Sequence, residues 1–330
     1  MKWRLVMIAL VALALAPGTF VRTPMGEPDL RPILRMAPLT HEPRSFDGFE
    51  IEGVWHLTSP NDLFGGFSGL AAIGDDEFLA VSDKGSWMRF GVPGSGTGAV
   101  FGELDRARLG DKRQVDAEAV TLDATSRRVW IAYEGTNTIE RSGYDLKGAQ
   151  RAKPAGMKDW PINGGAETLT RLAGGRFLAI GEGKAGLGEV GYPALLFDGD
   201  PVAGAEATSF RFAAPDGFRA TDAHALPDGR VVILMRSIKG YLPPRFGAKL
   251  AIADPAEIRA GEIWRAEVLA TFPASLPSDN FEGLAVQQRE GGGLTLWIMS
   301  DDNGASFQRT LLYKLRWDPA ATRENAMKDG

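Results

Sequence analysis

The sequence predicts an all-β protein, a β-propeller built from four-stranded blades. Five segments share one pattern of strand, tight turn and strand, and none of them shows helical periodicity. The segments begin at Ser68, Ala117, Ala166, Thr221 and Phe281. They recur about every 50 to 60 residues, which is the length of a four-stranded blade. The period predicts five blades around a central channel, with six blades as the alternative if one repeat has diverged.

The composition supports a folded domain and excludes several kinds of site. Of the 330 residues, 44% are hydrophobic and 24% charged, as expected of a globular chain with a substantial core. The net charge of −5, without a dense basic run, argues against nucleic acid as a partner. There is no cysteine, and the only histidines are His41, His56 and His224, so thiolate and common zinc sites are excluded. Any metal ion should be bound by oxygen atoms.

Residues 1–23 have the pattern of a signal peptide or signal anchor. Lys2 and Arg4 precede a short apolar run that ends in small residues. The run is shorter than the roughly 20 residues that cross a membrane comfortably. We therefore expect export to the periplasm or beyond, with a tether to the inner membrane through residues 5–21 as the alternative.

The propeller domain is expected to span residues 46–318, between a proline-spaced linker of residues 24–45 and a polar tail of residues 319–330. After the last repeat there is room for one further strand, Thr310–Trp317, whereas Phe49–Thr58 is an isolated strand before the first repeat. We expect these two strands to complete one blade together. Such pairing closes the ring by main-chain hydrogen bonds and leaves no open sheet edge there.

Polar residues recur in two columns, at the start of the first strand and at the end of the second strand of each repeat. The first column is Ser68, Glu118, Glu167, Asp222 and Glu282. The second column is Asp83, Glu134, Glu182, Arg236 or Ser237, and Asp301 with Asp302. These positions lie at the same end of an antiparallel hairpin. Because the first strand of each blade lines the channel, both columns should surround one channel mouth.

The acidic columns predict a calcium site. Carboxylates that converge in a partly buried mouth repel one another and need a compensating cation. Oxygen ligands in an irregular shell favour Ca²⁺. The expected ligands are Glu118, Glu167, Asp222, Glu282, Asp83, Glu134, Glu182 and Asp301. For any one of these acids, a role as a turn residue that accepts backbone hydrogen bonds is about equally good an explanation. Several acids in register are a more specific indication of a metal site.

Cations near the second column and two nucleophile arrangements complete the candidate site. The cations expected to orient an anionic substrate are Lys84, Arg236 and Arg309.

His224 with Asp222 is an alternative acid–base pair. A Ser-His-Asp triad is the weaker hypothesis, because the stretch around Ser68 is not a Gly-x-Ser-x-Gly elbow. A water activated by a metal ion, with a carboxylate as base, needs less special geometry.

Several segments resemble the phytase-like family of exported bacterial proteins, described as "esterase-like activity of phytase". The segments are GGFSGLAAIGDDEFLAVSDKG, NGGAETLTRL, SDNFEGLAVQ and LWIMSDDNGASFQRTLLYKLRW. The resemblance runs from about Phe46 to Trp317 and implies a propeller that hydrolyses phosphate or carboxylic esters. The sequence departs from the family pattern at Ala119 and Thr168, where glycine is typical, and at Ser68, which replaces an acid. The last departure reduces the expected number of metal ligands.

The sequence thus predicts a periplasmic or membrane-tethered propeller that binds Ca²⁺ and hydrolyses a small anionic ester. The residues expected to carry the chemistry are Glu282, Asp301, Glu118, Asp222 and His224. Two other functions stay open. One is a non-catalytic propeller that binds a protein, glycan or metabolite, and the other is a calcium-dependent lactonase similar in layout to gluconolactonase propellers.

Overall fold

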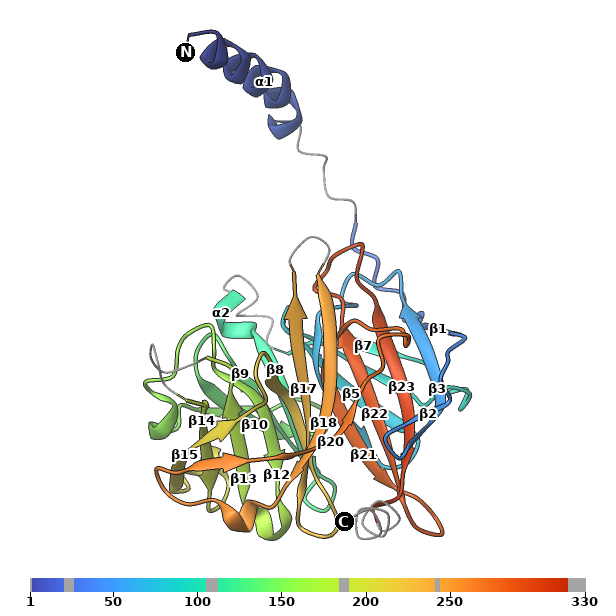
Figure 1. Cartoon of the computed structure of the whole chain (residues 1–330), viewed down its shortest axis with the longest axis vertical. Coiled ribbons are helices and arrows are strands. Elements are labelled where there is room, and N and C mark those ends of the chain that lie inside the picture. The colour runs from blue at the N-terminus through green and yellow to red at the C-terminus, as the bar shows by residue number, and fades with distance from the viewer. Residues whose placement is uncertain (1, 21–26, 105–111, 184–189, 241–243, 320–330) are drawn as a thin grey trace.

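Five sheets surround a central axis and form a five-bladed propeller (Figure 1). The computed structural model describes residues 2–20, 27–104, 112–183, 190–240 and 244–319. The innermost strands of the five sheets are β4 (Phe67–Ile73), β8 (Ala117–Asp123), β12 (Ala166–Arg171), β16 (Arg219–Ala225) and β21 (Asn280–Gln288). The predicted all-β propeller with five blades is confirmed, and the six-blade alternative is not.

The first two blades are simple antiparallel meanders. Blade one continues from β4 through β5 (Glu77–Ser82), β6 (Ser86–Gly91) and β7 (Val100–Glu103). Blade two follows the short helix α2 (Lys112–Val115) and continues from β8 through β9 (Arg128–Tyr133), β10 (Thr138–Gly143) and β11 (Gln150–Ala152). The second strand of a blade has a continuous apolar run, as in Phe78 to Val81, because both faces of the blade pack against neighbouring blades.

Blade three contains one strand that comes from the chain segment of blade four. Blade three contains β12, β13 (Phe177–Gly181), β14 (Tyr192–Phe197) and β15 (Ala207–Ala213), and blade four contains β16, β17 (Val231–Lys239), β18 (Arg245–Ala253) and β20 (Glu267–Thr271). Between β18 and β20 the chain crosses to blade three, where β19 (Ile263–Arg265) pairs in parallel with β15. Trp264 on β19 packs against Phe210 and Phe212, with ring centroids 5.8 and 5.7 Å away. This apolar contact holds the crossing strand in place.

Short 3₁₀ helices connect some of these strands. They are η1 (Ala155–Met157), η2 (Ala173–Gly175), η3 (Pro201–Ala203) and η4 (Pro255–Glu257). Asp200 and Asp254 cap η3 and η4, since each carboxylate accepts a hydrogen bond from a backbone amide two residues on. Both helices lie in loops at the outer side of their blades.

The two ends of the domain complete the fifth blade, as expected. This blade contains β21, β22 (Leu294–Asp301), β23 (Thr310–Trp317) and β3 (Phe49–Thr58). β3 pairs antiparallel with β23, with Tyr313 opposite Val54. The aromatic pair Phe49 and Trp317 stacks across this junction, at 5.2 Å between ring centroids. The first and last segments of the domain therefore close the ring.

Two short strands in or at the end of the expected linker pair with the fifth blade. β1 (Arg35–Pro38) adds to β3 with Ala37 opposite His56, and β2 (Ser45–Phe46) forms a hairpin with β3. The physical reason is that β3 offers an outer edge with unpaired backbone groups. A strand that ends in proline is tolerated at such an edge, because no further strand needs its missing amide hydrogen.

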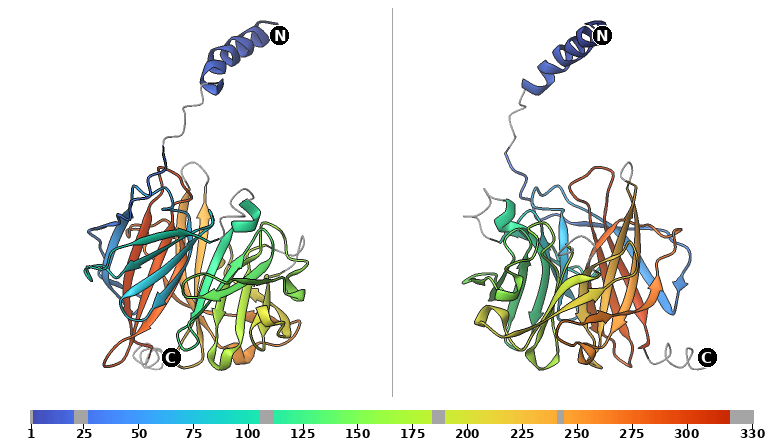
Figure 2. Two further views of the ribbon diagram at one scale, coloured as in Figure 1. Left: turned by 180° about the vertical axis from the view of Figure 1, so that it is seen from behind. Right: turned by 60° about the vertical axis from the view of Figure 1, so that its left-hand side comes forward.

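The N-terminal helix α1 (Lys2–Phe20) lies apart from the propeller in every view (Figures 1 and 2). Among the residues that the structure describes, no helix has both the length and the apolar character needed to cross a membrane. The predicted C-terminal tail falls almost entirely outside the described residues.

Candidate functional site

Each inner strand carries one β-bulge, always at the same end of the blade. The bulged residues are Ser68, Glu118, Glu167, Thr221 and Glu282. A bulge adds one unpaired residue to a strand and turns its side chain away from the regular alternation. The bulges therefore bring these five chain positions together at one end of the channel.

The second strands end beside these bulges. In blade two, Ala117 comes just before the bulge and pairs with Tyr133, and the residue after Tyr133 is the second-column residue Glu134. The other blades have the same register. The second-column residues fixed by these registers are Asp83, Glu134, Glu182, Arg236 and Asp301. Both columns thus lie at one end of the ring, around what we name the channel mouth.

The channel mouth is a small acidic cavity of about 220 Å³. Its lining residues are Ser68, Asp83, Glu118, Glu134, Asn163, Glu167, Glu182, Arg236, Glu282, Asp301 and Asn303. Seven of these carry carboxylates and one is a cation. The structure therefore brings the predicted column residues together, with Arg236 as the contribution of blade four. The exceptions are Asp222, Ser237 and Asp302, which do not line this cavity.

Asp222 is not part of the channel mouth, contrary to the sequence prediction. Thr221 occupies the bulge of blade four, so Asp222 lies one position further on and its side chain is turned toward blade five. Its carboxylate accepts hydrogen bonds from the amides of Leu284, at 2.7 Å, and Ala223, at 2.8 Å. Asp222 therefore joins two inner strands. Burial raises its pKa well above the ordinary value.

The alternative acid–base pair of His224 and Asp222 is not formed in the structure. Nδ1 of His224 lies 2.9 Å from the carbonyl oxygen of Ala225, whereas both oxygens of Asp222 accept backbone amides. Burial lowers the pKa of His224, so the imidazole is held neutral. His224 lies further along β16 than the bulge and does not line the channel mouth.

Arg236 is the cation of the channel mouth, and its partners are carboxylates of the protein. Its Nη2 lies 3.1 Å from Oε1 of Glu182 and 3.2 Å from Oε1 of Glu282. Arg219 adds a second contact to Glu182, 2.9 Å from Nη1 to Oε1. Arg236 thus neutralises part of the acidic ring, a role that differs from the direct substrate contact expected from the sequence.

The other two predicted cations lie beside the channel mouth rather than in it. Lys84 is exposed, and its Nζ lies near Gly304, at 3.3 Å from the position that a Cβ there would occupy. Arg309 belongs to the loop between β22 and β23, where its amide donates to Asp279 at 2.9 Å and its Nε lies 3.9 Å from the same carboxylate. Neither residue lines the cavity.

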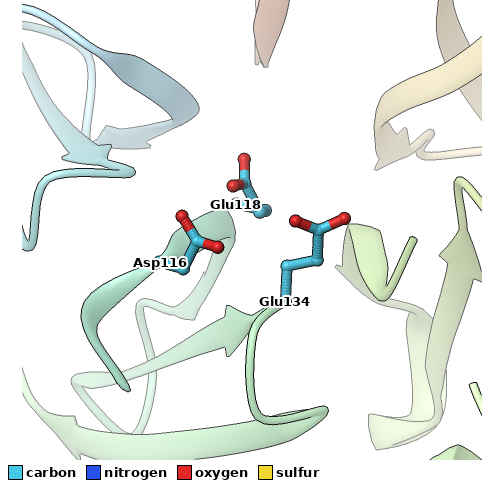
Figure 3. A group of neighbouring side chains, drawn as sticks. All are labelled: Asp116, Glu118 and Glu134. Atoms are coloured by element: carbon cyan, nitrogen blue, oxygen red, sulfur yellow. The ribbon is translucent and has the colours of Figure 1, made fainter. Parts of the chain in front are cut away.

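Two groups of three carboxylates in the channel mouth have the spacing of metal ligands. One group is Asp116, Glu118 and Glu134, and the other is Glu134, Glu167 and Glu182. Within each group, one oxygen per residue lies within 4.8 Å of the others. Figure 3 shows the three side chains of the first group turned toward a common space. Glu134 belongs to both groups.

Asp116 is a functional candidate that the sequence reasoning missed. It lies two residues before Glu118, is 9% exposed, and its carbonyl oxygen accepts the amide of Glu134 at 3.0 Å. The sequence contains the pair as Asp116-Ala117-Glu118, but the prediction of the first column took one polar residue from each strand. Asn163 and Asn303 were also missed because they come from loops, which have no strand periodicity to mark them.

Five carboxylates of the channel mouth have raised pKa values. Burial raises the pKa of Glu134 and of Glu282 to about 7, and that of Asp301 to about 8. Neighbouring acids add to the rise, as Asp116 and Glu182 do for Glu134. The pKa values of Glu118 and Glu167 are also raised, first by burial and then by nearby carboxylates. A cation among these carboxylates would favour their ionised forms.

Glycines and Asp302 support the wall of the channel mouth. Gly66 has φ of +69°, and a Cβ there would lie 2.3 Å from Oδ1 of Asp83. Its amide donates to Asp302 at 3.0 Å, and Asp302 also accepts from Gly304 and Thr310. Asp302 is therefore a turn residue that fixes the loop, whereas its neighbour Asp301 lines the cavity.

Several solved structures have a low-scoring likeness to this chain. Among solved structures, the chain is similar to one titled "Crystal structure of Nidogen/Laminin Complex", at 12% identity and a TM-score of 0.44, covering 88% of this chain and 94% of that one. It is also similar to the alpha-L-arabinofuranosidase PaAbf62A from Podospora anserina in complex with cellotriose, at 13% identity and a TM-score of 0.47, covering 78% and 95%. No curated protein matches the sequence.

One family model matches most of the chain. It is described as "Phytase-like: Esterase-like activity of phytase" and matches residues 62–304, which include all five bulges and both carboxylate columns. The match confirms the resemblance that the sequence motifs indicated. The chain therefore belongs to the phytase-like family.

Proposed function

We propose that this protein is a calcium-dependent hydrolase of a small phosphate or carboxylic ester, and that the channel mouth is its active site. The observation that carries the proposal is the convergence of seven carboxylates on a cavity of about 220 Å³, with Glu134 shared by two metal-ligand groups. Family membership agrees with a hydrolytic function.

The residues of the channel mouth fit a Ca²⁺ ion. Ca²⁺ binds oxygen at about 2.3–2.6 Å, so two oxygens on one ion lie within about 5 Å of each other. The carboxylate oxygens of each group meet this condition, at 4.8 Å or less. Asp116, Glu118, Glu134, Glu167 and Glu182 would hold the ion. When bound, Ca²⁺ supplies positive charge that offsets the charge developing on a reacting ester.

Glu282 and Asp301 are placed to move protons. Both line the cavity on neighbouring strands of blade five, and neither belongs to the two metal-ligand groups. In hydrolysis, water forms a bond to the ester centre and the bond to the leaving oxygen breaks. Glu282 would accept the proton of the attacking water, and Asp301 would donate a proton to the leaving oxygen.

Arg236 and Asn280 position Glu282. Nη2 of Arg236 lies 3.2 Å from its Oε1, and Nδ2 of Asn280 donates to the same oxygen at 2.7 Å. These two contacts fix the orientation of the carboxylate, which lines the cavity. Arg236 also keeps positive charge close to the reacting group.

Thermal unfolding with EDTA and with added Ca²⁺ tests the metal site. Occupancy at a hundred times the dissociation constant should stabilise the fold by about 2.7 kcal/mol, a shift of several degrees. We expect Ca²⁺ to give a saturable shift that Mg²⁺ does not reproduce. The absence of any shift would remove the calcium site from the proposal.

Turnover of a panel of aryl phosphates and aryl carboxylates tests the hydrolase. Glu282→Gln should lower kcat by at least about a hundredfold while the melting temperature in excess Ca²⁺ changes little. Lys147→Gln, an exposed cation in the turn between β10 and β11, is the matched control and should keep full activity. If no ester in the panel is hydrolysed, a non-catalytic binding function becomes the better reading.

We also propose that the propeller works outside the cytoplasm. Lys2 and Arg4 at the start of α1 and the apolar residues that follow support export. A fusion of residues 1–45 to a reporter enzyme that is active only outside the cytoplasm should be active. An inactive fusion, with reporter protein present, would contradict this location.

A further inference from the structure

A second cavity lies next to the channel mouth, between blades four and five. It is a groove of about 970 Å³, bordered by the ends of β17 and β18, by the loop from β20 to β21, and by the loop from β22 to β23. In the proposed function the channel mouth holds the reacting ester, and the groove has no part. Its size is enough for a molecule considerably larger than the group that fits in the mouth.

The wall between the groove and the channel mouth is one chain thick. Arg236 lines the mouth, whereas the next residue on β17, Ser237, lines the groove. Asn303 on the mouth side donates through Nδ2 to Oε1 of Gln308 on the groove side, at 3.3 Å. A ligand in the groove is therefore close enough for a short extension of it to reach the mouth.

The groove combines an apolar wall with a basic rim. Its apolar wall includes Phe218, Phe246 and Leu276, and Phe307 stands at its edge with 66% of its surface exposed. The cations of the lining are Lys239, Arg245 and Arg309. This composition suits a ligand that has an apolar body and an acidic group.

Asp279 is the single acid of the lining, and its oxygens are engaged by hydrogen bonds within the loop. Oδ1 of Asp279 accepts hydrogen bonds from the amide of Asn280 and from Nε2 of Gln308, both at 3.1 Å. Oδ2 accepts the amide of Arg309 at 2.9 Å. Asp279 is 5% exposed and serves to fix the loop. Nε of Arg309 lies 3.9 Å from Oδ2 of Asp279, so the accessible positive charge of the groove is that of Lys239 and Arg245.

Ser237 supplies an independent sign of a ligand site. Its side chain is 5% exposed, and within the described part of the chain Oγ has no hydrogen-bond partner. Gly247 lies opposite Ser237 on β18, and a Cβ there would be 2.8 Å from this Oγ and 3.8 Å from Phe218. The glycine keeps space open beside the hydroxyl. A buried hydroxyl without a partner costs free energy unless something bonds to it.

We propose that this groove binds a small amphiphilic anion, with the apolar body against Phe246 and the acidic group at Lys239 and Arg245. In the context of the proposed hydrolase, on which this part rests, the anion is the body of the substrate. The substrate class is then an aryl or alkyl ester that carries a second acidic group, such as a sulfonate or carboxylate, away from the bond that is cleaved.

Binding of 1-naphthalenesulfonate to the full chain in EDTA tests the groove without metal and without turnover. Calorimetry should show one saturable site, and methanesulfonate, which lacks the apolar body, should bind at least tenfold more weakly. The double variant Lys239→Glu/Arg245→Glu should weaken naphthalenesulfonate binding at least tenfold. Lys147→Glu, an exposed charge reversal on blade two, should change the affinity less than twofold. Equal affinity in the double variant and in wild type would overturn the proposal.

A second variant separates the apolar contact from the charge. Gly247→Leu places a side chain beside Ser237 and Phe218, so it should weaken naphthalenesulfonate binding at least fivefold while the circular dichroism spectrum stays native. Unchanged affinity in a folded Gly247→Leu protein would show that the ligand binds elsewhere. That result would reject the groove as the site.

Kinetics distinguish failure of the groove from failure of the hydrolase. If phenyl acetate and 4-acetoxybenzenesulfonate are both hydrolysed, Lys239→Glu/Arg245→Glu should raise KM at least tenfold for the sulfonated ester alone. Equal effects on both esters would reject the groove as the specificity site, although the hydrolase would stand. Tight naphthalenesulfonate binding that depends on Lys239 and Arg245, without hydrolysis of any ester, would support the groove and reject the hydrolase.

Discussion

Nη2 of Arg236 lies 3.2 Å from Oε1 of Glu282, inside a ring of carboxylates at the mouth of the propeller channel. Glu182 approaches the same nitrogen at 3.1 Å, so one guanidinium joins blade three to blade five. Blade four thus supplies a cation where the other four blades supply acids. The ring keeps a large excess of negative charge, which burial makes costly and which a bound cation would relieve.

Replacing Arg236 by methionine should destabilise the protein in a pH-dependent way. The guanidinium is 12% exposed, and its removal leaves Glu182 and Glu282 without their buried partner. We expect a loss of about 3 kcal/mol at pH 8, measured by urea unfolding in EDTA. The loss should shrink at pH 5, where Glu282, with its pKa raised to about 7, is protonated and no longer needs a cationic partner. An equal loss at both pH values would show that Arg236 acts through packing alone.

The metal-free protein should be more stable at pH 5 than at pH 8. The pKa of Asp301 is raised to about 8 and those of Glu134 and Glu282 to about 7, against an ordinary value near 4. Between these values the folded state holds protons that the unfolded chain has released, so stability falls as the pH rises. We expect a fall of at least about 2 kcal/mol in EDTA.

Saturating Ca²⁺ should flatten this pH profile, because the ion favours the ionised carboxylates. Urea unfolding at pH 5, 6.5 and 8, with and without Ca²⁺, gives both curves. A metal-free stability that rises with pH would contradict the raised pKa values.

Glu134→Gln should weaken Ca²⁺ binding more than Asp116→Asn does. Glu134 belongs to both three-carboxylate groups, whereas Asp116 belongs to one. We expect a loss of at least tenfold for the glutamine variant and a smaller loss for the asparagine variant, measured by calorimetric titration. The reverse order would mean that the ion sits on the Asp116 side without Glu134.

Asp222→Asn should reduce stability without changing Ca²⁺ affinity. The carboxylate accepts two backbone amides, from Ala223 and Leu284, and an asparagine has a single carbonyl oxygen to offer. One buried amide would lose its partner, at a cost of about 1–3 kcal/mol. Chemical unfolding and a Ca²⁺ titration on the same variant separate the two effects. A large loss of affinity would restore Asp222 to the metal site.

Gly66→Ala should cost more stability than Gly74→Ala. Both glycines have positive φ, +69° and +66°, so both variants carry the same backbone strain. A Cβ at Gly66 would lie 2.3 Å from Oδ1 of Asp83, whereas nothing lies within 4 Å at Gly74. The strain is worth about 1–2 kcal/mol, and any excess at Gly66 measures the displacement of Asp83. Equal losses would show that Asp83 moves aside freely.

Much of the architecture was determined by local sequence pattern. The strand boundaries Phe49–Thr58 and Thr310–Trp317 match β3 and β23, because alternation and turn residues act over a few residues. The period of the repeat set the number of blades. Both carboxylate columns followed from the geometry of a hairpin, except in blade four. There the bulge falls on Thr221, and a shift of one residue turns the side chain of Asp222 to the other face of the strand.

Only the tertiary structure decided how separate blades meet at the site. Glu134 of blade two meets Glu167 and Glu182 of blade three, and Arg236 of blade four pairs with Glu182 and Glu282 from other blades. The crossing of β19 to blade three and the pairing of β1 with β3 likewise depend on open sheet edges that exist only after the blades have assembled. Local periodicity determines where the strands begin and end. The contacts of a side chain with residues of other blades are determined only when the ring closes.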